Sequence, residues 1–238
     1  MIKLGLNIDH IATVRNARGE THPNLYSAAK YAYEYGADSI TIHLREDRRH
    51  IKAHDLKILS LYKKIPLNLE IAANKKMVKI ALNNNPNFIC IVPENRKEIT
   101  TEGGLNLKRN KKNIKKIISI FNKKKIRTSL FIDPKFSDIK ISKEINTNCV
   151  ELHTGKISNK IKLKKSYKNE LNQIINCAKY AKSLGIEVHA GHGMDYKTAK
   201  ILSRIKEIKE FNIGHFIIGE SIFFGLKKVI NNFKKILR

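Results

Sequence analysis

The sequence predicts a single (β/α)8 barrel over residues 1–238, and two observations support this fold class. Short runs rich in β-branched residues alternate with longer polar segments of helical pattern, which is typical of β–α units and a parallel sheet. Eight such units follow one another in 238 residues, close to the ~250 residues usual for a closed barrel. An open doubly wound sheet more often has a GxGxxG turn after its first strand, and this sequence has none there.

The predicted strands are short apolar runs, each ending where polar or glycine residues begin. They lie at 3–8, 38–43, 67–71, 87–92, 126–132, 148–153, 186–190 and 211–214. The predicted helices are the longer segments between them, at 24–35, 53–63, 74–83, 110–124, 135–143, 167–184, 195–204 and 220–236. The lysine-rich stretch 156–168 is predicted to be a loop or a solvated face, and the long segment 93–109 is the best candidate for a functional loop.

Composition indicates a cytoplasmic protein. No apolar run approaches the ~18 residues of a membrane span, because lysines interrupt each one. The N-terminal residues become polar too early for a signal peptide. The three cysteines, Cys90, Cys149 and Cys177, are too few and too scattered for a disulfide framework, and we expect them to be buried and inert.

The formal net charge of +26 has two interpretations. A basic surface supplies most of the non-specific affinity of proteins for nucleic acid. However, most of the excess is lysine spread over predicted helices such as 108–125 and 227–238, without a motif of aromatic residues and arginine. We therefore interpret the charge as lysine enrichment of solvated faces, which is compatible with steering of anionic substrates.

Reactive side chains follow every predicted strand. In a (β/α)8 barrel the carboxyl ends of the strands meet at one face, and active sites are built there. The residues at these ends are Asp9, His10, His43, Arg45, Glu70, Glu94, Thr100, Thr101, Glu102, Asp133, Glu151, His153, His189, His192 and His215. We therefore expect one active site that combines carboxylates, imidazoles and arginine.

Strand alternation orients two of the carboxylates. In the third strand Glu70 lies opposite the leucine face, and in the sixth strand Glu151 lies opposite the apolar face. If the apolar faces pack on helices, both glutamates point into the barrel, where desolvation raises the pKa toward the range useful for proton transfer. The alternative is that either glutamate balances a buried arginine or lysine.

Two glycine-containing segments, after the seventh and eighth strands, suit phosphate. Residues 189–195 (HAGHGMD) place two glycines before a helix whose expected N-cap is Asp195, and residues 212–215 (NIGH) lead towards the final helix. Backbone N–H groups and helix dipoles attract anions at such positions, and barrels frequently bind phosphate after strands seven and eight.

A metal site is the alternative use of the strand-end imidazoles, and it would combine Asp9, His10, His43, His189 and His192. We disfavour it because the first strand lacks the His-x-His pair of metallohydrolase barrels, since Ile8 stands two residues before His10.

Eight segments, in the same order along the chain, resemble the pyridoxine 5′-phosphate synthase family of the deoxyxylulose-dependent vitamin B6 pathway. They are NIDHIATVRNARG (7–19), GADSITIHLREDRRHI (36–51), NLEIA (68–72), IVPENRKEITTEGGL (91–105), SLFID (129–133), VELHTG (150–155), AGHGM (190–194) and NIGHFIIGES (212–221). Together they are far more specific than any single motif. The sequence departs from the family in the lysine-rich stretch 156–168 and in having His189 where Asn is expected.

The resemblance implies an enzyme that joins 1-deoxy-D-xylulose 5-phosphate to 3-amino-2-oxopropyl phosphate, closing the pyridine ring and releasing phosphate and water. It implies a (β/α)8 barrel with extra helices that uses no metal and no cofactor. It also implies self-association into a homo-octamer, a tetramer of dimers, and no nucleic-acid or membrane partner.

The resemblance also implies the roles of individual residues. His43 and Glu70 would act as general acid/base groups. His192 would be a proton donor, and Glu151 an electrostatic stabiliser. The amino-ketone phosphate would be held by Asn7, Arg18, Gly193, Gly214 and His215. The deoxyxylulose phosphate would be held by Asp9, His10, Arg45, His50 and Thr100.

Two other classes of protein remain as alternatives. One is a different phosphate-binding barrel, such as an isomerase or aldolase, and the other is a nucleic-acid-binding protein. A Schiff-base aldolase needs a buried lysine at a strand end, and none of the eight predicted strand ends has one.

Overall fold

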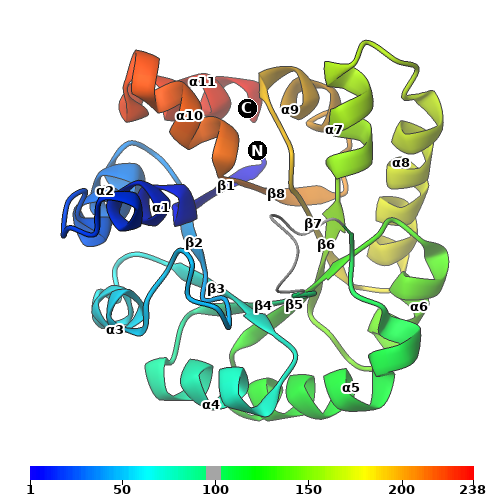
Figure 1. Ribbon diagram of the computed structural model, residues 1–238. Helices are drawn as coiled ribbons and strands as arrows, with labels where there is room; N and C mark the ends of the chain where they lie inside the picture. The colour runs from blue at the N-terminus through cyan, green and yellow to red at the C-terminus, as the bar shows by residue number, and fades with distance from the viewer. Residues whose placement is uncertain (95–102) are drawn as a thin grey trace.

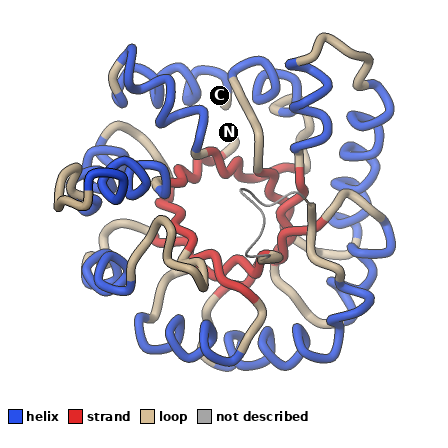
Figure 2. The backbone as a smooth tube through the Cα atoms, in the orientation of Figure 1, coloured by secondary structure: helices blue, strands red, loops and turns tan. Residues whose placement is uncertain are grey.

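The computed structural model describes residues 1–94 and 103–238. Within them eight parallel strands pair in chain order and close into a barrel, since β8 also pairs with β1. Figures 1 and 2 show this ring of strands with the helices around it. The strands are β1 (Lys3–Asn7), β2 (Ser39–His43), β3 (Leu67–Ala72), β4 (Phe88–Val92), β5 (Arg127–Ile132), β6 (Cys149–His153), β7 (Glu187–Gly191) and β8 (Ile208–Ile213). The predicted fold class is confirmed.

Eleven helices pack outside the ring in the described ranges. They are α1 (Asp9–Arg18), α2 (Leu25–Glu34), α3 (Ala53–Leu61), α4 (Lys75–Asn84), α5 (Leu107–Lys123), α6 (Phe136–Glu144), α7 (Gly155–Lys162), α8 (Lys168–Ser183), α9 (Tyr196–Leu202), α10 (His215–Phe224) and α11 (Leu226–Ile236). None of these helices is long and apolar enough to cross a membrane.

The first seven predicted strands agree with the observed ones to within one residue at each end, whereas β8 begins three residues earlier than predicted. The exposed Lys209 interrupts the apolar pattern at the start of β8. The register with β7 shifts between Val188 and His189, so that Val188 pairs with Ile208 and His189 pairs with Glu210. This irregularity in pairing, rather than a turn, explains the missed start of the strand.

Three observed helices correct the predictions. No helix was predicted where α1 lies, α7 lies largely in a segment predicted to be a loop or a solvated face, and α10 begins before the predicted helix 220–236. The prediction of a loop or solvated face over 156–168 is wrong at its start, because Ile157 and Ile161 of α7 are buried four residues apart on one face. The lysines of α7 occupy the remaining faces. The predicted helix 220–236 is in fact two helices, because Gly225 adopts a φ of 76° and separates α10 from α11.

The strand residues alternate between two environments. Leu67, Leu69 and Ile71 of β3 face the helices and belong to the main apolar core. The intervening residues, Asn68 and Glu70, face the barrel axis, which is polar along much of its length. The apolar packing between strands and helices therefore stabilises the barrel. Polar and reactive side chains can occupy the interior of the barrel.

The three cysteines are free and buried, as predicted. Burial raises the pKa of the thiols of Cys90 and Cys149 well above the ordinary value, and that of Cys177 to about 11. A thiol that is protonated and buried is a poor nucleophile.

Candidate active site

A cavity of about 430 Å³ lies at the carboxyl ends of the strands. Twelve of the fourteen predicted site residues line it: Asn7, Asp9, His10, His43, Arg45, His50, Glu70, Glu151, His192, Gly193, Gly214 and His215. Other residues of its lining are Val92, Phe131, Lys162, Met194, Asn212, Ile213 and Phe216. The structure thus brings together most of the groups that the strand ends predicted.

Two predicted residues are not part of this lining. Arg18 is the last residue of α1, and its side chain is 79% exposed with the guanidinium 3.6 Å from the carboxylate of Glu20. Thr100 lies outside the described residues, and the predicted loop 93–109 is described only at its two ends.

His43, the last residue of β2, lies among three carboxylates. Its Nδ1 is 3.8 Å from Oε2 of Glu70, which pairs with it in register on β3. Its Nε2 is 3.5 Å from Oε2 of Glu94, just after β4. Its backbone N–H donates a 2.9 Å hydrogen bond to Oδ1 of Asp9, which fixes the first turn of α1 against β2. An imidazole between carboxyl groups can both accept and return a proton.

Asp9, Glu70 and Glu151, three carboxyl groups of the cavity, have raised pKa values. Burial raises the pKa of Glu70 well above its ordinary value, and the charges of Glu151 and Asp9 add to the effect. Burial also raises the pKa of Glu151, to about 8, with the charge of Glu210 adding and a hydrogen bond from Asn212 opposing. Both glutamates therefore hold a proton more tightly than an ordinary carboxyl group, as their predicted orientation into the barrel implied.

Glu94 has the opposite character. Burial alone would raise its pKa, but hydrogen bonding from His43 and from the backbone N–H of Glu46, with the charges of His43 and Arg45, lowers it. The Glu46 N–H donates to Oε1 of Glu94 at 2.6 Å. His43 therefore lies between two carboxyl groups of opposite tendency. The carboxyl group of Glu70 favours the protonated form, and that of Glu94 favours the ionised form.

Glu151 occupies space that β7 leaves open. Oε2 of Glu151 accepts a 2.8 Å hydrogen bond from Nδ2 of Asn212 on β8. Between these two strands lies Gly191 on β7, where an added Cβ would stand only 1.9 Å from Oε1 of Glu151. The glutamate can face the cavity because residue 191 has no side chain.

Three imidazoles cluster at the side of the cavity formed by α1 and the β2–α3 loop. The ring of His10 lies 5.8 Å from that of His50 and 4.8 Å from that of His215. Burial lowers the pKa of His10, and the charge of His215 adds to the effect. Burial lowers the pKa of His50 to about 4, and the charges of His10 and Arg45 add to this effect. An anion placed here would favour protonation of these imidazoles and accept hydrogen bonds from them, so the cluster suits a phosphate.

His192 follows β7 in a strained conformation. Its φ of 78° lies in the left-handed region, which is unfavourable for a side chain with a Cβ. The hydroxyl of Thr154 holds the turn by donating a 2.7 Å hydrogen bond to the carbonyl oxygen of His192. Burial lowers the pKa of His192 to about 4, and the charges of His153 and Lys162 add to the effect. In the free protein this imidazole is therefore neutral at pH 7.

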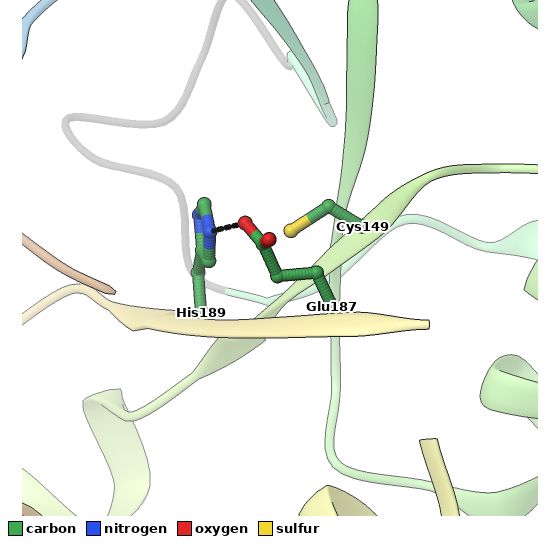
Figure 3. Close-up of side chains that lie close together, drawn as sticks. All are labelled: Cys149, Glu187 and His189. Carbon is green, nitrogen blue, oxygen red and sulfur yellow. Dashed lines mark hydrogen bonds and ion pairs between the residues drawn. The ribbon is translucent and has the colours of Figure 1, made fainter. Parts of the chain in front are cut away.

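Towards the amino ends of the strands, the barrel interior holds a charged network. Nη1 of Arg127 and Nε2 of His189 both contact Oε1 of Glu187, at 2.6 and 2.7 Å. Nδ1 of His189 is 3.8 Å from Oε1 of Glu210. Figure 3 shows the Glu187 carboxylate between the His189 ring and the Cys149 sulfur. Ligand atoms of these three residues lie within 4.8 Å of one another, but Arg127 already neutralises the carboxylate that a cation would need.

A second group of potential metal ligands consists of Asp9, His43 and Glu70, whose ligand atoms also lie within 4.8 Å of one another. Two of these residues, His43 and Glu70, are also the pair whose side chains lie close enough for proton transfer through the imidazole. Cation binding and proton transfer are competing uses of one cluster, and removal of metal distinguishes them.

Asp133, whose role the sequence leaves open, lies beside the cavity lining rather than in it. It lies 3.5 Å from Nδ1 of His153, and it accepts hydrogen bonds from the Gly104 N–H and from Nζ of Lys135, both at 3.0 Å. These partners, His153 first, hold the pKa of Asp133 well below its usual range. Through these contacts Asp133 connects the backbone at Gly104 to His153 at the end of β6.

Sequence reasoning assigned no role to the side chains of Asn212, Phe131 or Lys162, which also line the cavity. Strand alternation could have found Asn212 and Phe131, since each stands at an inward-facing position near the end of its strand. Lys162 gave no signal, because it is one of many lysines in a segment predicted to be a loop or a solvated face.

Comparison with known proteins gives a consistent result. A family model described as pyridoxal phosphate biosynthesis protein PdxJ matches residues 4–238. Pyridoxine 5′-phosphate synthase of Pelagibacter ubique (strain HTCC1062) is 66% identical over 236 residues, with 99% of each chain covered. The enzyme of the same name from Zymomonas mobilis is 48% identical, with 99% of this chain and 91% of the relative covered.

Solved structures share the fold. The 3-hexulose-6-phosphate synthase of Salmonella typhimurium aligns with a TM-score of 0.69 and 10% identity, over 99% of this chain and 98% of that one. A phosphoribosyl anthranilate isomerase aligns with a TM-score of 0.59 and 11% identity, over 100% of this chain and 98% of that one. At such low identity these similarities concern the fold alone.

Proposed function

The chain belongs to the family of pyridoxal phosphate biosynthesis protein PdxJ, and on that premise we propose how its residues divide the work of a pyridoxine 5′-phosphate synthase. The reaction joins 1-deoxy-D-xylulose 5-phosphate to 3-amino-2-oxopropyl phosphate and closes the pyridine ring, with release of phosphate and water. The observation that carries the assignment of residues is that one cavity at the strand ends holds acid/base groups between two regions suited to phosphate.

The deoxyxylulose phosphate binds beside α1 and the β2–α3 loop. His10 and His50 lie there with Arg45, and Asp9 is held by Asn7 at 3.0 Å. Thr100 belongs to the same proposed subsite. A phosphate dianion would pair with the guanidinium and would favour protonation of the neighbouring imidazoles.

The amino-ketone phosphate binds at the ends of β7 and β8. Gly193 and Gly214 stand two residues beyond Gly191 and Asn212, which pair in register, so the two glycines follow neighbouring strands. The first turn of α10 contains no acidic residue, and its N-terminal end suits an anion. Asn7, Arg18 and His215 complete this proposed subsite. Of these assignments, that of Arg18 has the least structural support, because its side chain is exposed and is not part of the cavity lining.

The proton transfers fall to four residues. Imine formation, loss of phosphate, loss of water and ring closure each move protons at carbon, nitrogen or oxygen. His43 and Glu70 act as the general acid/base pair, supported by their 3.8 Å separation and the raised pKa of Glu70. His192 donates a proton after substrate binding raises its pKa. Glu151 enters the reaction protonated, and its ionised form stabilises positive charge that develops beside it.

We propose that the enzyme is cytoplasmic, needs no metal or cofactor, and assembles as a homo-octamer, a tetramer of dimers. Self-association is supported by three apolar side chains at the end of α10: Ile222, Phe223 and Phe224 are 75%, 79% and 57% exposed. An apolar group of this kind on a soluble domain favours contact with another protein surface.

Two alternatives are less well supported. A Schiff-base aldolase would need a buried lysine, and the one lysine in the described cavity lining, Lys162, is exposed on a helix. A nucleic-acid-binding role would rest on the net charge alone. Lysine enrichment predicts only weak association that falls steeply with salt.

The direct test is to incubate the purified protein with both phosphorylated substrates and to follow pyridoxine 5′-phosphate by its absorbance. Formation of the product, with stoichiometric release of inorganic phosphate, supports the proposed function. Omission of either substrate is the control. Failure to form product with an enzyme that is folded and saturated with both substrates would contradict the proposed function.

A further inference from the structure

One face of α7 packs along the turn that carries His192 and Gly193. An added Cβ at Gly193 would stand 3.3 Å from Cβ of Ser158 and 3.5 Å from Cα of Gly155. Gly155, Ser158 and Lys162 are three and four residues apart in sequence, so they lie on one side of the helix. The face that touches the turn therefore ends at Lys162.

Lys162 extends this face to the cavity. Its exposed side chain lines the cavity with His192 and Gly193, and no ion pair to it is found in the described part of the chain. Arg45 is the other described lining residue with a permanent positive charge, and it belongs to the opposite subsite. Lys162 is thus a cation at the β6–β7 side of the cavity, and residues 1–94 and 103–238 supply no counter-ion to it.

A second observation concerns the same turn. Ser158 is 1% exposed, and its hydroxyl has no hydrogen-bond partner among the described residues. Gly193, against which it packs, adopts a φ of 76°, a left-handed conformation that turns the backbone at the end of β7. Buried hydroxyl groups normally have partners, so this side of the turn is incomplete without one.

We propose that Lys162 is a substrate-binding residue, and that its ammonium group pairs with the phosphate monoester held by Gly193 and Gly214. The inference rests on the proposed function, because it concerns the subsite assigned there to the amino-ketone phosphate. The flexible stem of lysine suits this position, since it can follow a phosphate that enters from the cavity mouth.

Occupation of this site would also act on the proton donor. The positive charge of Lys162 helps to keep the pKa of His192 low in the free protein. A bound phosphate neutralises that charge and adds negative charge near the imidazole, so the pKa of His192 rises. Substrate binding and loading of the proton donor are therefore linked through one lysine.

The test compares Lys162→Met, Lys162→Arg and the matched control Lys165→Met. Lys165 is exposed near the end of α7 and does not line the cavity, so its replacement removes the same charge without touching the proposed site. Steady-state kinetics should show a KM for 3-amino-2-oxopropyl phosphate raised about tenfold in Lys162→Met. The KM for deoxyxylulose phosphate should change less than about twofold, Lys162→Arg should restore most of the loss, and Lys165→Met should match the wild type.

Two measurements besides activity separate a binding role from a structural one. Calorimetry with inorganic phosphate as the probe should show weaker binding to Lys162→Met and unchanged binding to Lys165→Met. NMR titration of the His192 ring should give a higher pKa in Lys162→Met than in the wild type without phosphate, and a smaller rise when phosphate is added.

The outcomes also separate this inference from the proposed function. If the wild type forms product and Lys162→Met has unchanged KM and phosphate affinity, the role of Lys162 is wrong and the proposed function stands. If the wild type forms no product but phosphate binding is lost in Lys162→Met alone, the proposed function fails and the phosphate site remains.

Discussion

Nδ2 of Asn212 donates a 2.8 Å hydrogen bond to Oε2 of Glu151, across the end of β7 and at the floor of the cavity. This contact favours the ionised carboxylate, whereas burial and the charge of Glu210 favour the protonated form. Burial raises the pKa of Glu151, and two residues of β8 then act on it in opposite directions.

These opposing influences predict shifts of opposite sign. Glu210→Gln removes a negative charge that disfavours ionisation of Glu151, so the pKa should fall by about one unit, whereas Asn212→Leu removes a hydrogen bond to the carboxylate, so the pKa should rise by about one unit. The alkaline limb of the pH profile of kcat should move in the same directions. Shifts of the same sign in both variants would contradict this account of Glu151.

Replacement of Glu70 by Gln should lower kcat by roughly 10²–10⁴-fold, the usual contribution of a general acid/base group. The free energy of unfolding should be unchanged or higher, because the raised pKa of Glu70 makes the neutral amide a close substitute for the protonated carboxyl group. Stopped assays and urea titration of the same preparation measure the two effects. His43→Ala should also lose turnover. Full turnover in folded Glu70→Gln enzyme would remove Glu70 from the mechanism.

The buried ion pair of Arg15 and Asp55 predicts a stability effect away from the cavity. Arg15 donates to both carboxylate oxygens of Asp55, at 2.6 and 2.9 Å, and joins α1 to α3. Arg15→Met leaves the buried carboxylate without a counter-ion, which should cost about 3–5 kcal/mol of unfolding free energy.

Urea unfolding measures this cost, and the double variant Arg15→Met/Asp55→Leu is the control. It should recover much of the loss, although it also removes the 2.8 Å hydrogen bond from the Lys52 N–H that caps α3. A double variant as unstable as the single one would show that the unpaired charge is not the cause.

Removal of metal tests the use of the cluster formed by Asp9, His43 and Glu70. If these groups transfer protons without a metal, dialysis against a chelator should leave kcat and both KM values unchanged. The dialysed enzyme is assayed with and without added Zn²⁺ or Mg²⁺, and its metal content is measured. Loss of activity that only a divalent cation restores would assign the cluster to metal binding.

The sequence predicts the barrel well because strand patterns are local. The alternation that separates Glu70 and Glu151 from their apolar neighbours follows from two-residue periodicity alone. The N-cap of α9 was also predictable, since Asp195 accepts a 2.7 Å hydrogen bond from the Thr198 N–H. Such features need no knowledge of the rest of the chain.

Other features depend on tertiary packing. The contact of His43 with Glu94 joins residues 51 positions apart, at the ends of the two strands that flank β3, and no local pattern specifies its 3.5 Å distance. The apolar pair Ile157 and Ile161 was visible in the sequence, but the surrounding lysines masked α7 as a helix. Without α7, the presence of Lys162 in the same cavity lining as Gly193 could not be predicted.

The space at Gly191 has a consequence for how this protein can change. Because the carboxyl group of Glu151 fills the volume that any side chain at position 191 would need, even alanine there requires the glutamate to move. A lineage in which Glu151 keeps this position and its hydrogen bond to Asn212 therefore favours glycine at 191, and one that loses the glutamate is released from that constraint. The constraint runs in one direction: a side chain at position 191 is accommodated more easily after Glu151 has changed, whereas Glu151 can change while Gly191 stays.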